Sequence, residues 1–369
     1  MIALHPVIVS GEHIWNRGLL PVDEFRSRTA GVLELMRKHQ IGGLIIHGNA
    51  QHSDLITYLS NYIPRMRWAV ALLDAAGELS LYVAGPTRDL HFLKPLTHVA
   101  DIKPFEALAA DLPQWLAAAQ AASSRIGLAG YRSMRPNVKA LLERHVSWEA
   151  LHQSDTEVDQ FLARKRPREI RALAHCSEHV QSELAGLKSR CGADASGIPE
   201  EILETERRCL TDGGYHVSTL FSVDGGATLG PLVPNGFRAP PATRSAAYLA
   251  FRVDGYWSEG LTTVGSSAAL DATVQECLDA ALAAMVPGNS VQAVCEAIDR
   301  FRAGSAQHPF TADAVSLLGL SIRPCGPGEI LLPDSIYSLK VGLTRESVHA
   351  FGSAVAKTGP DGGQIMLRL

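Results

Sequence analysis

The 369-residue sequence lacks the signals of nucleic-acid-binding and membrane proteins. Its formal net charge is −4, so it has no excess of basic residues to attract phosphate groups or an anionic lipid surface. No apolar run reaches the ~20 residues that a membrane-spanning helix requires. We therefore expect no nucleic acid and no membrane among the partners.

Secretory and disulfide signals are also missing. The opening residues, Met1–Val9, carry no basic flank and are too short for a signal peptide. No Cys-x-x-Cys pair occurs among the six cysteines, which lie at positions 176, 191, 209, 277, 295 and 325. We expect free thiols and, by elimination, a cytoplasmic location.

Common catalytic motifs are absent as well. The chain has no Gly-x-Ser-x-Gly turn for a serine nucleophile and no Gly-x-x-x-x-Gly-Lys-Ser/Thr loop for phosphates. It also has no dinucleotide-binding glycine fingerprint after a predicted strand. These absences leave a catalytic function to be argued from other residues.

The residues that are present predict two domains. The length exceeds what one hydrophobic core usually supports, and 46% of the residues are hydrophobic. Helical apolar spacing runs over 22–39, and Gly42–Gly43 is predicted to stop that helix before a strand at 44–46. Two further strands, 68–73 and 79–83, flank a predicted turn. The pattern breaks at 152–156, so we predict domains at residues 1–156 and 157–369.

The second domain alternates differently. We predict a long first helix and a second helix, followed by strands and then another helix pair. The stripe of apolar residues in Leu270–Leu282 is expected to face the domain's own core. The predicted ranges are helices at 157–191 and 198–212, strands at 215–223 and 246–264, and helices at 269–285 and 290–303.

The segment Tyr248–Gly265 resembles a hairpin of the creatinase, aminopeptidase P and methionine aminopeptidase family. Members typically read Asp-x-Gly-x-x-x-x-Gly-Tyr-x-x-Asp-x-Thr-Arg-Thr there. Similar segments occur in the same order at 21–28, 33–46, 58–62 and 164–173. The resemblance implies an α/β protein, with an amino-terminal creatinase-like α/β domain followed by a pita-bread α+β domain.

The resemblance also implies that the family's metal ligands are missing. Tyr248 and Glu259 match its two aspartates, Ser316 matches its histidine, and Lys340 matches its first glutamate. No carboxylate occurs in 349–353, the segment near which the last glutamate is expected. Because only Glu259 is acidic, we predict no metal and no cofactor.

Lys340 is expected to occupy part of the vacated metal volume beside Glu259. One interpretation gives Glu259, Lys340, Tyr248 and His216 catalytic roles in proton transfer. The other is a structural ion pair that fills a dead site. Creatinase hydrolyses a C–N bond without metal, but its histidine base matches Leu232 here, so that mechanism cannot be transferred.

Several side chains are candidates for substrate binding. Arg323 lies where creatinase carries an arginine for its substrate's carboxylate, and a guanidinium suits a carboxylate through two parallel hydrogen bonds. Segment 62–67 resembles one that reaches the site of a neighbouring subunit in creatinase, which implies a homodimer. The substrate-binding candidates are Arg323, Arg65, Arg67, Ser316, His308 and His349.

Three functions remain open. The first is a metal-independent enzyme that uses acid/base chemistry for hydrolysis, elimination or rearrangement, at a C–N bond of a small carboxylate-bearing, amino-acid-derived molecule. The second is a non-catalytic homologue that binds a peptide or a partner protein in the former active-site cleft. The third is a metal-dependent Xaa-Pro peptidase.

Overall fold

The computed structural model divides the chain into two compact units, Met1–Leu162 and Ala163–Leu369, called here the amino-terminal and carboxy-terminal units. The division falls later along the chain than the boundary predicted at residues 156 and 157. The structure describes residues 15–64, 67–191, 198–211, 214, 216–222, 229–230, 245–265, 268–301, 314–345 and 348–369. No helix among these residues is both long and apolar enough to cross a membrane.

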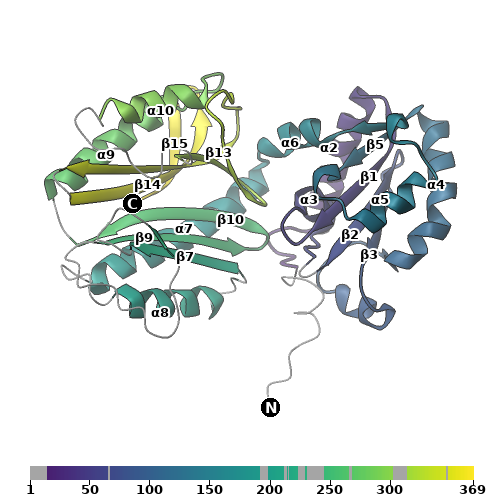
Figure 1. The fold of residues 1–369 in the computed structure, drawn as a ribbon, viewed down its shortest axis with the longest axis horizontal. Coiled ribbons are helices and arrows are strands. Elements are labelled where there is room, and N and C mark those ends of the chain that lie inside the picture. The colour runs from purple at the N-terminus through teal and green to yellow at the C-terminus, as the bar shows by residue number, and fades with distance from the viewer. Residues whose placement is uncertain are drawn as a thin grey trace, which may run out of the picture. The chain divides into compact units, whose positions relative to one another are not determined.

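The amino-terminal unit is built on a six-stranded sheet in the order β4-β3-β2-β1-β5-β6, with helices packed around it (Figure 1). The hairpin predicted between residues 68 and 83 is confirmed as the antiparallel pair β2 and β3. The strands are β1 (Ile41–Asn49), β2 (Trp68–Asp74), β3 (Leu79–Val83), β4 (Asp101–Pro104), β5 (Arg125–Ala129) and β6 (Leu151–Gln153). The α-helices are α2 (Val22–Lys38), α3 (Asp54–Ser60), α4 (Leu108–Ala122), α5 (Pro136–Glu143) and α6 (Asp155–Ala163), and short 3-10 turns are η1 (Thr87–Leu93), η2 (Phe105–Ala107), η3 (Tyr131–Ser133) and η4 (Trp148–Ala150).

The first helix confirms the predicted spacing, but not the predicted stop signal. Helix α2 ends at Lys38, and the chain then turns at Gln40, whose φ of 56° lies in the left-handed region. Gly42 and Gly43 are strand residues of β1, so the prediction that they stop the helix was wrong. A Cβ on Gly42 would overlap the carbonyl oxygen of Ala119 in α4. The glycine is therefore needed for close approach of helix and sheet.

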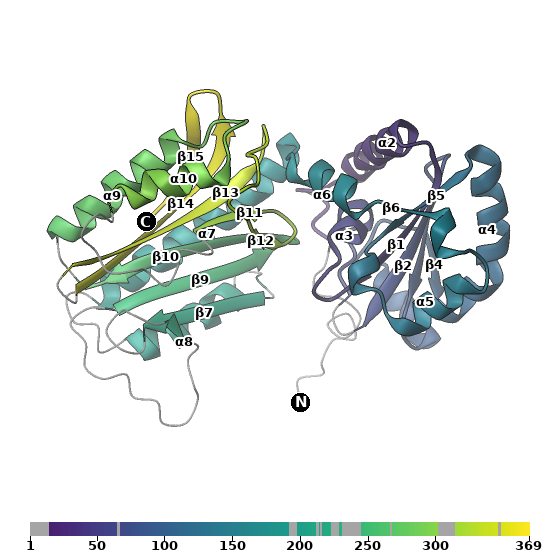
Figure 2. The same cartoon turned by 45° about the horizontal axis from the view of Figure 1, so that its top comes forward.

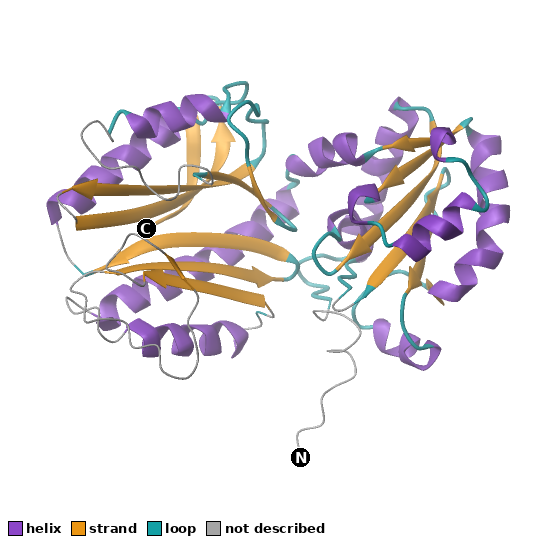
Figure 3. Ribbon diagram, viewed as in Figure 1, coloured by secondary structure: helices purple, strands orange, loops and turns teal. Residues whose placement is uncertain are grey.

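The carboxy-terminal unit contains two antiparallel sheets, in the orders β10-β9-β7-β8 and β12-β11-β13-β14-β15 (Figure 3). The first sheet comprises β7 (His216–Ser222), β8 (Leu229–Gly230), β9 (Ser245–Val253) and β10 (Tyr256–Val264). The second comprises β11 (Val315–Leu318), β12 (Ile322–Pro324), β13 (Ile336–Arg345), β14 (Val348–Gly359) and β15 (Gly362–Arg368). The helices are α7 (Pro167–Cys191), α8 (Ile198–Thr211), α9 (Ala268–Ala283) and α10 (Val291–Asp299).

The single helix predicted over 157–191 is two helices, α6 and α7. Pro167 begins α7, and a proline disfavours helical geometry in the residue before it while it fits the first turn of a new helix. The prediction missed this break because apolar spacing continues on both sides of it.

Each sheet of the carboxy-terminal unit is covered on one face by helices. Figure 2 shows α9 and α10 along the second sheet, and α7 and α8 along the first. Val274 and Leu278 of α9 share a core cluster with Leu339 of β13, which confirms the predicted inward apolar stripe. On the first sheet, Ser177 of α7 and Ser258 of β10 pair through their hydroxyls at 2.9 Å.

The two sheets are joined where β10 runs beside β14. The hydroxyl of Ser353 accepts from the backbone nitrogen of Leu261 at 2.7 Å and donates to its carbonyl at 3.0 Å. In return, the hydroxyl of Thr263 accepts from the backbone nitrogen of Phe351 at 2.6 Å and donates to its carbonyl at 3.2 Å. Side-chain hydroxyls thus replace a backbone ladder at this junction.

Gly42→Ala should destabilise the protein. The new Cβ would meet backbone atoms of α4, including the nitrogen of Ser123 at 2.7 Å, and backbone cannot rotate away. We expect a loss in the upper part of the range of about 1–3 kcal/mol that is typical of overpacking, measured by urea unfolding. The control is Gly85→Ala, whose Cβ would meet only a guanidinium nitrogen of Arg67 at 3.5 Å. Equal stabilities of the two variants would contradict the close approach.

Candidate functional site between the two sheets

Strand registers bring the predicted site residues onto facing surfaces of the two sheets. In the first sheet, Glu259 lies opposite Ala250 and Tyr248 lies opposite Leu261, so both side chains are on one face. In the second sheet, Ser316 lies opposite Ser338, and Lys340 follows two residues later on the same face. The helices cover the other faces, so these polar side chains lie between the sheets.

The side chains of Tyr248, Glu259, Ser316, Ser338 and Lys340 form one hydrogen-bonded group, called here the inner polar cluster. The ammonium of Lys340 donates to Glu259 Oε1 at 2.5 Å and to the hydroxyl of Ser316 at 3.1 Å. Ser338 also donates to Glu259 Oε1, and Tyr248 donates to Oε2 at 2.6 Å. The proximity of Glu259 and Lys340 expected from the sequence is thus seen in the structure, with Tyr248 and Ser316 bound to the same pair.

The central ion pair is almost completely removed from solvent. Glu259 is 1% exposed and Lys340 is 4% exposed, whereas Tyr248 is half-buried. Burial alone would raise the pKa of Glu259, but the charge of Lys340 and the hydrogen bonds from Lys340, Ser338 and Tyr248 outweigh it. The net effect lowers the pKa of Glu259 below its ordinary value, so the carboxylate is ionised at neutral pH.

Ser338 was not among the residues predicted for the site. Its side chain was overlooked because no family motif marks it. A period of two along β13 places it on the same face as Lys340, so strand alternation was the available signal.

The inner polar cluster does not fit a pair of divalent ions. Two-metal sites need several carboxylate or imidazole ligands, and the cluster offers one carboxylate, which already accepts three hydrogen bonds. An ammonium has no lone pair with which to bind a metal. The donor set of these five side chains is therefore unsuited to a dinuclear centre.

Arg323 is not brought to the inner polar cluster. Arg323 lies on β12 opposite Leu317 of β11. Ser316, the neighbour of Leu317, lies opposite Pro324 instead. Strand alternation therefore puts the side chains of Arg323 and Ser316 on different faces. The side chain of Arg323 is 44% exposed, and its guanidinium contacts the carboxylate of Glu329 at 3.0 and 2.8 Å. The geometry therefore argues against a shared site with Glu259.

The predicted histidines are described to different extents. His349 is half-buried on β14, on the same face as Phe351, and the two rings stack with centroids 6.5 Å apart. Phe351 packs in a small cluster with Leu261, against which Tyr248 also lies. His216 belongs to β7, but its side chain is outside the described residues, as are His308 and Arg65.

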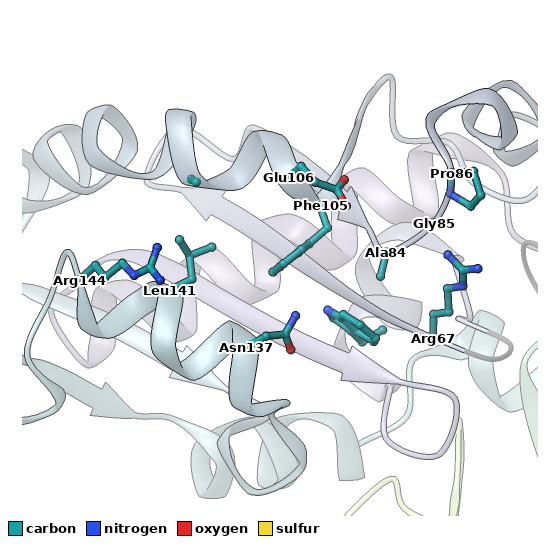
Figure 4. Close-up of a pocket in the computed structure, with 11 residues that line it drawn as sticks. Arg67, Ala84, Gly85, Pro86, Phe105, Glu106, Asn137, Leu141 and Arg144 are labelled. Atoms are coloured by element: carbon teal, nitrogen blue, oxygen red, sulfur yellow. The ribbon is translucent and has the colours of Figure 1, made fainter.

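Arg67 belongs to a different cavity, within the amino-terminal unit. It lines a pocket of about 900 Å³ together with residues of β2, η2 and α5. Figure 4 shows Arg67 and Arg144 at opposite ends of this pocket, with Phe105 and Asn137 between them. Arg67 thus lines a pocket of its own unit, and its predicted contact with a substrate stays a prediction.

The fold matches solved structures of proline-specific peptidases. The prolidase from Pyrococcus horikoshii OT3 has a TM-score of 0.70 and 14% identity, over 92% of this chain and 97% of that protein. The Xaa-Pro dipeptidase from Bacillus anthracis has a TM-score of 0.69 and 12% identity, over 93% and 97% of the two chains. Proline aminopeptidase P II from Yersinia pestis has a TM-score of 0.68 and 13% identity, over 93% and 95%.

No family model and no curated protein sequence matches the chain. At identities this low the structural likeness establishes the fold alone. It confirms the predicted α/β architecture, a creatinase-like amino-terminal domain followed by a pita-bread domain.

Lys340→Met should strongly destabilise the carboxy-terminal unit. The substitution keeps a long apolar side chain and removes the ammonium, which leaves Glu259 as an uncompensated buried charge. We expect a loss of about 3–5 kcal/mol in the free energy of unfolding, measured in urea.

Two controls separate this effect from general damage. Lys357→Met removes a more exposed amine that pairs with Asp334 at 2.8 Å, and it should cost no more than about 1 kcal/mol. Adding Glu259→Gln to Lys340→Met removes the stranded charge and should recover part of the loss. Additive losses in the double variant would show that the two groups do not interact.

Acid should weaken the contribution of Glu259 to stability. Because its pKa is lower in the folded state than in the unfolded chain, the contribution is fully present above the ordinary pKa of about 4.3 and is lost as pH falls through the folded value. The stability difference between wild type and Glu259→Gln should therefore shrink as pH is lowered from neutrality. Urea unfolding at several pH values measures it, with the exposed Glu149→Gln as control; a constant difference would refute the lowered pKa.

Proposed function

We propose that the protein is a metal-independent enzyme that performs acid/base chemistry on a small carboxylate-bearing molecule. The observation that carries this proposal is the ammonium of Lys340, hydrogen-bonded to Glu259 at 2.5 Å between the two sheets. By the resemblance, Lys340 occupies the position of a metal-binding glutamate. A fixed positive charge thus stands where related proteins use metal ions.

Lys340 has the donor capacity to bind a substrate oxygen. An ammonium carries three N–H donors, and within the described residues two of them have acceptors, Glu259 and Ser316. The third donor is available to a carbonyl or carboxylate oxygen of a bound molecule. A preorganised charge in a water-poor site stabilises negative charge that develops on such an oxygen, as an oxyanion hole does.

Tyr248 is the proposed proton-transfer group. It is the half-buried member of the inner polar cluster, so a small molecule would reach its hydroxyl first. Glu259 accepts a hydrogen bond from that hydroxyl and fixes its direction. Since Glu259 has a lowered pKa, its role in this proposal is to hold and orient charge rather than to act as the base. The nearby ring of His349 is a candidate partner for the second proton.

The substrate's carboxylate needs a cationic partner. Arg323 is a weak candidate because Glu329 occupies its guanidinium. Arg67, with Arg65, remains the proposed ligand if it is contributed by a second copy of the chain, which makes a homodimer part of this proposal. Hydrolysis, elimination or rearrangement at a C–N bond all fit a site that stabilises an oxyanion and transfers protons.

A specific observation favours a second function, a non-catalytic homologue that binds a peptide or partner protein. Glu259 accepts three hydrogen bonds inside the cluster and is ionised, which makes it a poor proton acceptor. In that case the ion pair fills a former active site and the inner surface serves binding only. The third function, a metal-dependent Xaa-Pro peptidase, is opposed by the donor set.

Tyr248→Phe should separate these functions. Small carboxylates would first be screened by thermal shift in excess chelator, since a ligand of the native state raises the melting temperature. A hit would then be incubated with the protein and its conversion followed by mass spectrometry. If the first proposal holds, conversion proceeds in chelator and falls by a factor of about 10²–10⁴ in Tyr248→Phe, the usual contribution of general acid–base catalysis.

The other outcomes assign the other functions. A ligand that binds wild type and Tyr248→Phe equally well, but is converted by neither, would support the non-catalytic homologue. Cleavage of an Xaa-Pro peptide only after Mn²⁺ or Zn²⁺ is added would contradict the first two functions and support the metal-dependent Xaa-Pro peptidase. Tyr248→Phe keeps the aromatic ring and its packing against Leu261 and Phe351, so the variant differs from wild type only in the lost hydroxyl.

A further inference from the structure

Three metal-binding side chains meet in the amino-terminal unit, outside the inner polar cluster. They are His39, His152 and Glu157, and one ligand atom from each lies within 4.8 Å of the others. All three are half-buried, so an ion from solvent could reach them. None of them was singled out by the sequence motifs.

Local structure explains why these residues converge. His39 caps the end of α2, and His152 lies in β6, opposite Gly127 of β5. Helix α6 begins directly after β6, which places Glu157 in its first turn. His152 Nε2 lies 3.1 Å from Glu157 Oε1, and His39 Nδ1 lies 3.9 Å from the same oxygen. The two imidazole rings face each other with centroids 6.0 Å apart.

Both histidine contacts of Glu157 involve the same carboxylate oxygen, Oε1. Its second oxygen, Oε2, is buried and has no hydrogen-bond partner among the described residues. A buried carboxylate oxygen without a donor is costly, and such atoms in native structures call for an explanation. A cation held by this carboxylate and the two imidazoles would compensate the buried charge of Glu157, including that on Oε2.

We propose that His39, His152 and Glu157 form a binding site for a divalent transition-metal ion of the Zn²⁺ type. Two imidazoles and one carboxylate are ligands that Zn²⁺ prefers, with solvent in a further position. In a tetrahedral site, metal–ligand bonds of about 2.0–2.1 Å place the ligand atoms roughly 3.3 Å apart. His152 and Glu157 are already about this close, so only His39 has to approach. The ion would tie the end of α2 to the start of α6. This inference is independent of the proposed enzyme function, because all three ligands lie in the amino-terminal unit.

The test is titration of the full chain, free of metal and of any histidine tag, with Zn²⁺ by calorimetry. Co²⁺ is the second probe, since its visible absorption reports four-coordinate nitrogen and oxygen ligation. We expect one equivalent of Zn²⁺ to bind and the melting temperature to rise. His152→Ala and Glu157→Gln should each lower the affinity at least about tenfold, because loss of an outer-shell partner alone costs that much. Affinity should also fall on acidification, because protons compete with the metal for its ligand atoms.

A matched control excludes a surface histidine pair. His175 and His179 lie one turn apart on α7, with ring centroids 4.7 Å apart, and could capture Zn²⁺ weakly. The His175→Ala/His179→Ala variant should keep the tight site, and the metal-free variants should match wild type in circular dichroism. Absence of saturable binding, equal affinity in wild type and His152→Ala, or loss of binding in the α7 variant would each overturn the proposal.

Discussion

The ion pair of Glu259 and Lys340 is the interaction on which the arrangement of the carboxy-terminal unit depends. It joins β10 of one sheet to β13 of the other, in a place where neither charge meets solvent. Such a pair stabilises a fold only when further hydrogen bonds support it, and here three hydroxyls bind to the two charged groups. Because hydrogen bonds are directional, the pair also restricts how the two sheets slide past one another, which apolar contacts alone would not do.

Much of the inner polar cluster could be predicted, because it follows from strand alternation and from the family resemblance. Strand alternation places Tyr248 and Glu259 on one face of a hairpin, and the resemblance places Lys340 opposite them. The length of the hairpin fixes its register, so the shared face of Tyr248 and Glu259 follows from the sequence. Ser338 follows from the same alternation along β13, but its pairing with Ser316 depends on the register between β11 and β13, which are separated in sequence by β12.

Arg323 and Gly42 lie in surroundings that the sequence did not predict, for a shared physical cause. Arg323 lies on a short strand, where a shift of one residue moves a side chain to the opposite face, and sequence similarity does not resolve such a shift. Gly42 was assigned to a helix end because glycine often ends helices, whereas its role is to let α4 approach the sheet. Contacts between segments distant in sequence decided both cases. The convergence of His39, His152 and Glu157 is of the same kind.

The hydroxyl bridges between β10 and β14 have a consequence for solubility. Strand β10 is the last strand of its sheet, and such a strand normally offers its backbone to any chain that comes close. Here Ser353 occupies both backbone groups of Leu261, and Thr263 occupies both of Phe351. Ser353 therefore blocks part of an edge that would otherwise be a template for intermolecular β-pairing, and Thr263 ties that edge to β14 while the two sheets stay distinct.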